Sequence, residues 1–197
     1  MSTTNSSKSG KLNGVRVAIL ATQGFEQVEL TEPKAALEEA GAKVDVVSPK
    51  AGIKSGKIKG WNMTDWGESV KVDVELSDAK EGNYDALLLP GGVMNPDKLR
   101  MDPQAVAFVK SFFTASKPVA AICHGPWTLI EADVVRGRTM TSWPSLQTDL
   151  RNAGATWVDQ EVTEDNGLVT SRKPDDIPAF NQRMIELFSK AAHRAAA

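Results

Sequence analysis

Pro118-Val119-Ala120-Ala121-Ile122-Cys123-His124-Gly125-Pro126 decides the fold, and it holds the only cysteine among the 197 residues. Residues 119–122 are small or β-branched, as a buried parallel strand requires. Gly125 permits a sharp bend, and proline suits the first turn of a helix, where its missing N–H leaves no bond unmade. The stretch therefore predicts a strand, a tight turn and a helix, with Cys123 at the carboxyl end of a sheet.

Cys123 has two interpretations. The N-terminus of a helix stabilises a thiolate, and a thiolate is a nucleophile, so the predicted turn favours a reactive cysteine with His124 beside it. A lone cysteine in a soluble protein is otherwise most often a small buried hydrophobic residue, and His-Gly-Pro can simply be a turn. The combination of the turn and the adjacent histidine favours the reactive thiol.

Composition indicates a single domain with a substantial core. The net charge of −2 argues against the basic face that a nucleic-acid partner needs. One cysteine cannot form an internal disulfide, so no oxidising compartment is implied. No apolar run approaches the length of a membrane span, and the N-terminal stretch lacks the apolar core of a signal peptide. We expect a cytoplasmic protein with no membrane or nucleic-acid partner.

The ends of the chain differ in composition from its centre. Residues 1–14 are rich in Ser, Thr, Asn, Lys and Gly and predict a disordered polar tail, followed by one domain over 15–192. The alanine-rich segment 191–197 is expected to fray from the last helix.

Short apolar runs alternate with helical patterns, which predicts a doubly wound, mostly parallel sheet. The expected strands are 15–20, 43–47, 86–89, 119–122, 139–141, and a terminal pair, 157–162 and 168–171, joined by a turn at 165–167. The expected helices are 25–40, 103–116, 126–134, 145–153 and 177–192. Residues 50–80 predict a hairpin around 57–61 and 70–74, whose Trp61 and Trp66 form a substrate wall or, more often, a core edge or a subunit contact.

Two loops are expected at the carboxyl ends of strands, where α/β sheets place their sites. One is Thr22–Glu29; the other is Pro90-Gly91-Gly92, whose backbone N–H groups could stabilise an oxyanion or simply form a tight turn. The phosphate-binding motifs GxxxxGK[ST] and GxGxxG are absent, and no group of ligands predicts a metal. We therefore expect no cofactor.

Glu26, Glu29 and Glu32 follow each other at a spacing of three, which places them near one helical face. Such a pattern usually marks a solvated surface. If Glu29 instead points inward toward Cys123, burial raises its pKa and lets it donate a hydrogen bond to a thiolate. Spacing alone does not decide between these interpretations.

The segment 121–126 resembles the nucleophile elbow of the ThiJ/PfpI family, within the class I glutamine amidotransferase-like fold. Further matches are Gly24 to Pro33, Asp85 to Gly92, Gly137-Arg138 through Trp143-Pro144, and Gly167 through Ser171-Arg172. The resemblance extends over residues 15–190. It implies a flavodoxin-like α/β sandwich with a mostly parallel central sheet and helices on both faces, assembled as a homodimer or a higher oligomer.

The resemblance also implies roles for individual residues. Cys123 matches the nucleophile, Glu29 the glutamate of an E-x-x-x-P pattern, and Glu26 a second carboxylate of the PfpI branch. His124 matches the histidine that follows the nucleophile, and Asp97 best matches the acid that a neighbouring subunit offers to it. The oxyanion donors would be the N–H groups of Gly92 and His124.

Family members are described as glyoxalase-type or deglycase-type enzymes and as intracellular peptidases. The resemblance therefore implies a cysteine-dependent, stress-protective enzyme that acts on small reactive carbonyls, on glycated groups or on peptides. Glutamine hydrolysis is disfavoured, because the family lacks a separate downstream histidine. The alternative is a stress chaperone or redox sensor in which Cys123 is reversibly oxidised.

Overall fold

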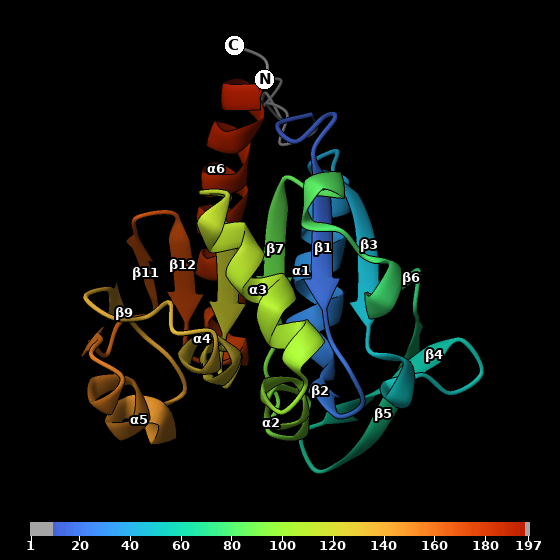
Figure 1. Ribbon diagram of the computed structural model, residues 1–197, viewed down its shortest axis with the longest axis horizontal. Coiled ribbons are helices and arrows are strands. Elements are labelled where there is room, and N and C mark those ends of the chain that lie inside the picture. The colour runs from blue at the N-terminus through green and yellow to red at the C-terminus, as the bar shows by residue number, and fades with distance from the viewer. Residues whose placement is uncertain (1–9, 196–197) are drawn as a thin grey trace, which may run out of the picture.

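A seven-stranded sheet forms the centre of the computed structural model, which describes residues 10–195 and the side chains of residues 10–190 (Figure 1). All neighbouring strands are parallel except the pair β11 and β12. Across the sheet the strands follow the order β11 (Val162–Asp165), β12 (Leu168–Ser171), β8 (Val119–Ile122), β7 (Ala86–Leu89), β1 (Arg16–Leu20), β3 (Lys43–Ser48) and β6 (Val74–Glu75). The expected parallel sheet is confirmed.

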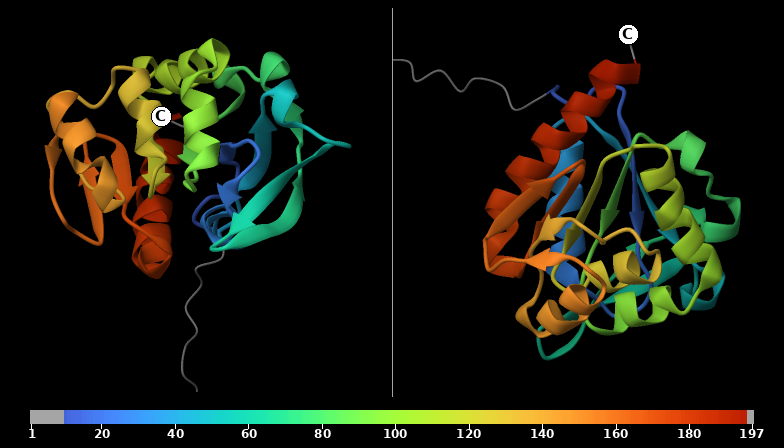
Figure 2. Two further views of the ribbon diagram at one scale, coloured as in Figure 1. Left: turned by 90° about the horizontal axis from the view of Figure 1, so that it is seen from below. Right: turned by 60° about the vertical axis from the view of Figure 1, so that its left-hand side comes forward.

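Helices cover both faces of the sheet (Figures 1 and 2). The helices α1 (Gln27–Glu39) and α6 (Ile177–Ala195) pack together on one face. The other face carries α2 (Met94–Arg100), α3 (Pro103–Thr114), α4 (Pro126–Glu131) and α5 (Gln147–Asn152). This arrangement is the expected α/β sandwich.

The alternation of side chains along the central strands fills two cores. In β1, Val17 and Ile19 pack toward α1 and α6, whereas Ala18 and Leu20 pack toward α3. Because helices cover both faces of the sheet, the sequences of these strands are continuously apolar and do not alternate between apolar and polar residues.

Residues 10–14 correct the predicted N-terminal boundary. The Leu12 side chain is fully buried, and its backbone N–H donates to the carbonyl of Ala40 at 2.9 Å. The folded unit therefore includes the last five residues of the predicted tail, because one leucine in a polar stretch anchors them. Residues 1–9, the rest of the predicted tail, lie outside the described residues.

A smaller three-stranded sheet lies beside the carboxyl ends of the main strands. Its order is β2 (Phe25–Glu26), β4 (Lys57–Asn62) and β5 (Asp65–Lys71), so the predicted hairpin is confirmed with shifted boundaries. Trp61 and Trp66 form an edge-to-face pair on it, with ring centroids 5.6 Å apart, and Trp66 is 44% exposed. Residues 25–26 were expected to begin a helix, but their backbone pairs with β4, and α1 starts at Gln27.

Three other expectations are corrected. Residues 94–100, for which no helix was expected, form the additional helix α2. The expected strand 157–162 is two short strands, β10 (Thr156–Trp157) and β11. β10 pairs with β9 (Thr139–Met140) outside the main sheet. The helix expected over 126–134 ends at residue 131.

None of the described helices is long and apolar enough to cross a membrane.

Candidate active site

Cys123 lies on the expected sharp turn between β8 and α4. Its backbone has φ of +61°, in the left-handed region that non-glycine residues rarely adopt. The turn is held by the Cys123 N–H, which donates to the Ser171 carbonyl at 3.1 Å, and by the Trp143 N–H, which donates to the Cys123 carbonyl at 3.0 Å. A Cβ at Gly125 would lie 2.7 Å from the Leu89 carbonyl, so only glycine fits there. The side chain is 7% exposed.

The structure separates the three glutamates by burial. Glu29, in the first turn of α1, is fully buried, whereas Glu26 is half-buried and Glu32 is exposed. Their spacing of three in the sequence predicts that all three lie near one helical face, and it does not distinguish them. Because β2 and the hairpin set the direction of α1, Glu29 faces the carboxyl end of the sheet.

Glu29 contacts both the glycine loop and the cysteine. One carboxyl oxygen, Oε2, accepts from the Gly91 N–H at 3.0 Å. The other, Oε1, is buried without a nitrogen or oxygen partner among the described residues, and the carboxyl interacts with the thiol of Cys123. Burial raises the pKa of Glu29 to about 8, with a further increase from the charge of Glu26. Glu29 is therefore protonated at neutral pH and can donate a hydrogen bond.

The environment of Cys123 differs from the expectation of a thiol activated by a helix. Burial raises the pKa of the thiol, and an ionised Glu29 would raise it further. Backbone N–H groups of Gly92 and His124 act in the opposite direction. α4 has only six residues, so its dipole opposes the desolvation of a buried thiolate weakly. A thiolate here is less unfavourable while Glu29 keeps its proton than when Glu29 is ionised.

His124 lies against the sulfur. Its Nδ1 is 3.2 Å from Cys123 Sγ, and its Nε2 is 3.4 Å from Ser145 Oγ. Burial lowers the pKa of His124 to about 4, so the ring is neutral at pH 7 and able to accept a proton from the thiol. Sequence reasoning did not identify Ser145, because a serine after Trp-Pro carries no signal of contact with a histidine 21 residues earlier.

The loop Pro90-Gly91-Gly92 approaches the site too closely for any side chain. A Cβ at Gly91 would lie 2.4 Å from Glu29 Oε2 and 2.7 Å from Cys123 Cβ. Gly92 has φ of +76°. Its N–H interacts with both Cys123 and Glu29, and its role as an oxyanion donor stays a prediction.

Asn95 is a further residue that the sequence did not reveal. Its fully buried amide Nδ2 donates to the carbonyls of Pro90 and Gly91 at 3.0 and 3.1 Å, and its Oδ1 accepts from the Thr22 N–H at 2.8 Å. It joins the two loops that were expected to form the site. An asparagine in the first turn of an unrecognised helix gave no such indication.

Asp97 is an exposed residue of α2. Among the described residues, no hydrogen bond or ion pair links it to His124 of the same chain; it lines a shallow surface groove with Arg100 and Lys110. Nor does any group of three or more His, Cys, Asp or Glu side chains in the described part of the chain lie close enough to hold a metal ion.

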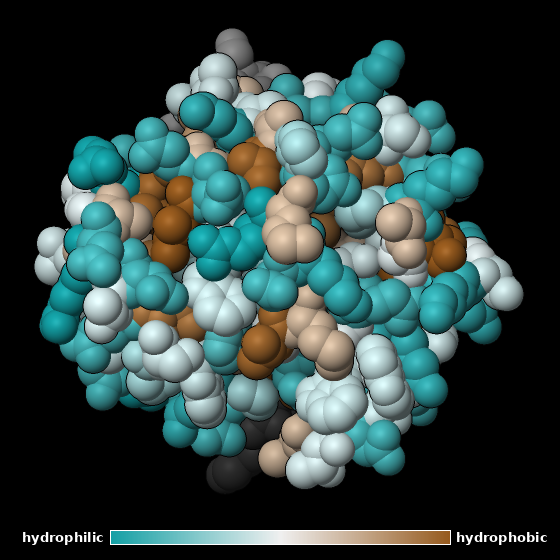
Figure 3. Space-filling model, turned by 60° about the horizontal axis from the view of Figure 1, so that its bottom comes forward, coloured by the Kyte–Doolittle hydropathy of each residue, from teal (hydrophilic) through white to brown (hydrophobic). Residues whose placement is uncertain are grey.

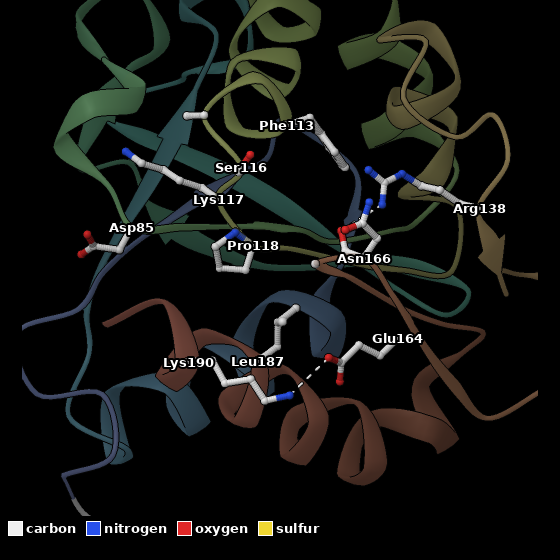
Figure 4. A pocket seen from close by; sticks show the side chains of 12 residues that line it. Asp85, Phe113, Ser116, Lys117, Pro118, Arg138, Glu164, Asn166, Leu187 and Lys190 are labelled. Carbon is white, nitrogen blue, oxygen red and sulfur yellow. Dashed lines mark hydrogen bonds and ion pairs between the residues drawn. The ribbon is translucent and has the colours of Figure 1, made fainter. Parts of the chain in front are cut away.

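A cavity of about 770 Å3 lies at the opposite end of the sheet from Cys123 (Figure 4). Among its lining residues, Asp85 and Lys117 precede β7 and β8, and Leu187 and Lys190 come from the far end of α6. The charged groups on its walls already have partners: Lys117 donates to the Tyr84 carbonyl at 2.7 Å, and Lys190 pairs with Glu164 at 3.4 Å. The chemistry-bearing groups therefore lie elsewhere, at the carboxyl ends of the strands.

Residues 15–187 match the model of the DJ-1/PfpI family. The chain belongs to the DJ-1/PfpI family. It is 44% identical over 178 residues to General stress protein 18 of Bacillus subtilis, covering 90% of this chain and 99% of that protein. It is also 44% identical to Protein/nucleic acid deglycase 2 of Escherichia coli, covering 87% and 96%. The B. subtilis protein named "Putative cysteine protease YraA" is 43% identical, with 87% and 97% covered.

Solved structures of DJ-1/PfpI proteins have the same fold. The Schizosaccharomyces pombe DJ-1 structure covers 93% of this chain and 100% of its own, with a TM-score of 0.77 at 20% identity. A two-domain protein of Anabaena variabilis, with DJ-1/ThiJ/PfpI-like and ferritin-like domains, has a TM-score of 0.80 at 36% identity. That match covers 87% of this chain and 47% of the two-domain protein. The expected family and the α/β fold are thus confirmed, whereas the roles of individual residues remain predictions.

Proposed function

We propose that this chain is a cysteine-dependent, stress-protective enzyme that acts on small reactive carbonyls or glycated groups. The proposal rests on one observation: the sulfur of Cys123 contacts two groups that can transfer a proton, one that carries a proton to give and one that is free to take a proton. Glu29 is protonated at neutral pH and can give a proton, whereas neutral His124 can take one. Among the relatives, proteins named as a deglycase and a general stress protein agree with this activity.

The chemistry follows from the positions of these groups. The sulfur of Cys123 attacks the carbonyl carbon of the substrate, and as the S–C bond forms the thiol proton passes to His124. The oxygen of that carbonyl becomes an alkoxide, which the N–H groups of Gly92 and His124 stabilise and Glu29 protonates. With methylglyoxal, the product is a hemithioacetal. Transfer of a proton between its adjacent carbons gives a thioester, which water hydrolyses to lactate, so no oxidant or reductant is needed.

Burial favours a small substrate over a polypeptide. Cys123 and His124 are each 7% exposed, and Glu29 is fully buried. An extended peptide needs a long open cleft, whereas a three-carbon carbonyl needs only access to the sulfur. A peptidase activity, which one relative's name suggests, is therefore the second candidate.

A kinetic comparison on one preparation tests the proposal. Methylglyoxal, a glycated amino acid and a short peptide would each be offered to the wild type and to Cys123→Ser. We expect turnover of a carbonyl substrate that Cys123→Ser abolishes. Turnover of peptides alone would replace the proposal with a peptidase. No turnover of any of the three, with reversible oxidation of Cys123, would favour the redox sensor or chaperone.

We also propose a cytoplasmic homodimer, or an oligomer of dimers, with a site shared between subunits. α2 presents Asp97 to solvent, and the exposed apolar side chains of Val93 and Met101 flank it at 56% and 76% exposure. Figure 3 shows the end of the molecule where the parallel strands terminate and α2 lies. Exposed apolar groups beside a carboxylate suit a surface that a second copy covers.

A further inference from the structure

Among the side chains that the structure describes, no carboxylate pairs with His124. Among the described residues, its ring nitrogens are near only Cys123 Sγ, at 3.2 Å, and Ser145 Oγ, at 3.4 Å. In many enzymes an acid fixes the orientation of such a ring. The weak contact with an exposed serine cannot do the same, so within one chain it is packing that orients this imidazole.

Two tryptophans supply that packing. The ring of Trp127, from α4, meets the imidazole edge-on, with centroids 5.0 Å apart and planes at 66°. The ring of Trp143 is stacked at 6.0 Å and 24°. If the imidazole ring rotated by half a turn, a ring carbon would face the sulfur of Cys123 in place of Nδ1. Contacts with two large rings restrict that motion, because aromatic pairs have preferred geometries.

Trp127 is itself held by two other helices. Its indole N–H donates to Asp149 Oδ2 of α5 at 3.0 Å, and the Arg100 guanidinium of α2 lies over its ring, 5.6 Å from the centroid. Arg100 is held in turn by Glu131 at 3.4 Å. Figure 1 shows α4 between α5 and α2, near the carboxyl ends of the strands. In the described part of the chain, the Trp143 indole has neither a hydrogen-bond acceptor nor a cation over its ring, and Trp143 is 38% exposed. Trp127 is therefore the more firmly held member of the pair.

We propose that Trp127 is the positioning residue of His124, and that Asp149 and Arg100 fix it so that the imidazole keeps its nitrogen toward Cys123. The consequence for turnover rests on the proposed function, but the effect on the ring and the thiol does not. The charged or titratable groups around this unit are Cys123 with Glu29 on the sulfur side, and Arg100 with Glu131 and Asp149 behind the indole.

The first test compares Trp127→Leu with Trp127→Phe, without any substrate. NMR titration of His124 and the alkylation rate of Cys123 by iodoacetamide are the readouts. In Trp127→Leu, water reaches the ring, so the pKa of His124 should rise from about 4 toward 6.5. Alkylation at pH 7 should nevertheless slow about tenfold, because the released ring no longer holds its nitrogen toward the sulfur. Trp127→Phe keeps an aromatic edge and should retain most of the wild-type values.

The second test changes the anchor of Trp127. Asp149→Ala removes the acceptor of the indole N–H, whereas Asp149→Asn keeps an oxygen that can accept it. We expect Asp149→Ala to shift both readouts in the direction of Trp127→Leu, and Asp149→Asn to restore them. Loss of charge alone would affect the two variants equally, and that result would contradict the role of the hydrogen bond.

Trp157→Leu is the matched control, because the Trp157 indole also donates to a side-chain oxygen, Ser142 Oγ at 3.0 Å, but does not pack on His124. It should leave both readouts near wild type. Equal shifts in Trp157→Leu and Trp127→Leu, or unchanged readouts in a Trp127→Leu protein that circular dichroism shows to be folded, would overturn the proposal. If the readouts shift as expected but no carbonyl is turned over, only the proposed function fails.

Discussion

At the scale of single residues, the site depends on the proton that buried Glu29 keeps beside the buried sulfur of Cys123. Glu29 is fully buried, and its raised pKa of about 8 follows first from desolvation. The same desolvation opposes the charge of a Cys123 thiolate. A neutral Glu29 beside the sulfur is therefore what makes a thiolate tolerable, since a carboxylate there would add repulsion.

A comparison of three carboxamide variants tests this assignment. Glu29→Gln removes the only buried acid of the three and should reduce turnover strongly, about 100-fold for loss of an acid–base group. Glu32→Gln changes an exposed residue and should be near neutral, and Glu26→Gln should lie between them. Steady-state kinetics would measure the effects, with circular dichroism as a control for folding. Equal losses from all three would contradict a special role for Glu29.

The pH dependence of kcat/KM is a separate prediction. Activity requires protonated Glu29 and neutral His124, whose pKa values are about 8 and about 4. The rate should therefore fall as pH rises through about 8 and as it falls through about 4. In Glu29→Gln the alkaline decrease should be absent from the residual rate, because glutamine does not ionise. Persistence of that decrease in the variant would assign it to another group.

At the scale of elements, the short segments between strands and helices build the site. The glycine loop after β7, the turn after β8 and the first turn of α1 meet at the carboxyl ends of adjacent strands. The strands and the turn at Cys123 were predictable, because their apolar runs and Gly-Pro signals are local. α2 was not: its sequence, residues 94–100, contains Pro96 and no apolar repeat, and its position depends on Asn95 bonding to the glycine loop.

Gly91→Ala tests the close approach of the glycine loop. The new Cβ would lie 2.4 Å from Glu29 Oε2 and 2.7 Å from Cys123 Cβ, so one of these groups must move. We expect a loss of activity of at least tenfold and a destabilisation of about 1–3 kcal/mol, as for overpacked cores. Gly82→Ala is the matched control, since Gly82 has open space around it and no positive φ. If Gly91→Ala keeps the wild-type kinetic constants, activity does not require the close approach of the glycine loop to Glu29 and Cys123.

At the scale of the whole molecule, the sequence resemblance predicted the family and the sheet, but contacts over long sequence distances escaped it. Leu12 packs with Ala40, and Ser145 approaches His124, through the fold alone. The sequence of one chain also does not predict which residues a second subunit contributes. Asp97 remains a prediction for this reason: it is exposed, on a helix with apolar neighbours.

Mixing two inactive variants tests the shared site. Asp97→Ala lacks the proposed acid and Cys123→Ser lacks the nucleophile, but one of the two sites in a mixed dimer pairs an intact Cys123 with an intact Asp97. We expect mixing to recover part of the activity, and dilution of the wild type below its dissociation constant to lower the specific activity. No recovery in mixed oligomers verified by native mass spectrometry, or full activity of a monomer, would rule out the shared site.

The stability of the whole chain should depend on pH through two of its buried titratable groups, His124 and Glu29. Between pH 4 and 6.5 the unfolded chain protonates His124 and the folded chain does not, so this group makes stability rise with pH. For Glu29 the sign is opposite: between pH 4.5 and 8 the folded chain holds a proton that the unfolded chain has lost, so stability falls as pH rises.

Below pH 6.5 the effects of His124 and Glu29 on the free energy of unfolding oppose each other. From pH 6.5 to 8 only the Glu29 effect remains of the two, and one proton over that interval corresponds to a decrease of about 2 kcal/mol in the free energy of unfolding. Urea unfolding at a series of pH values would measure it. Glu29→Gln should abolish the decrease, because its amide binds no proton in either state. The same decrease in Glu29→Gln would mean that Glu29 is already ionised in the folded protein, and the proton that the proposed chemistry needs would not be there.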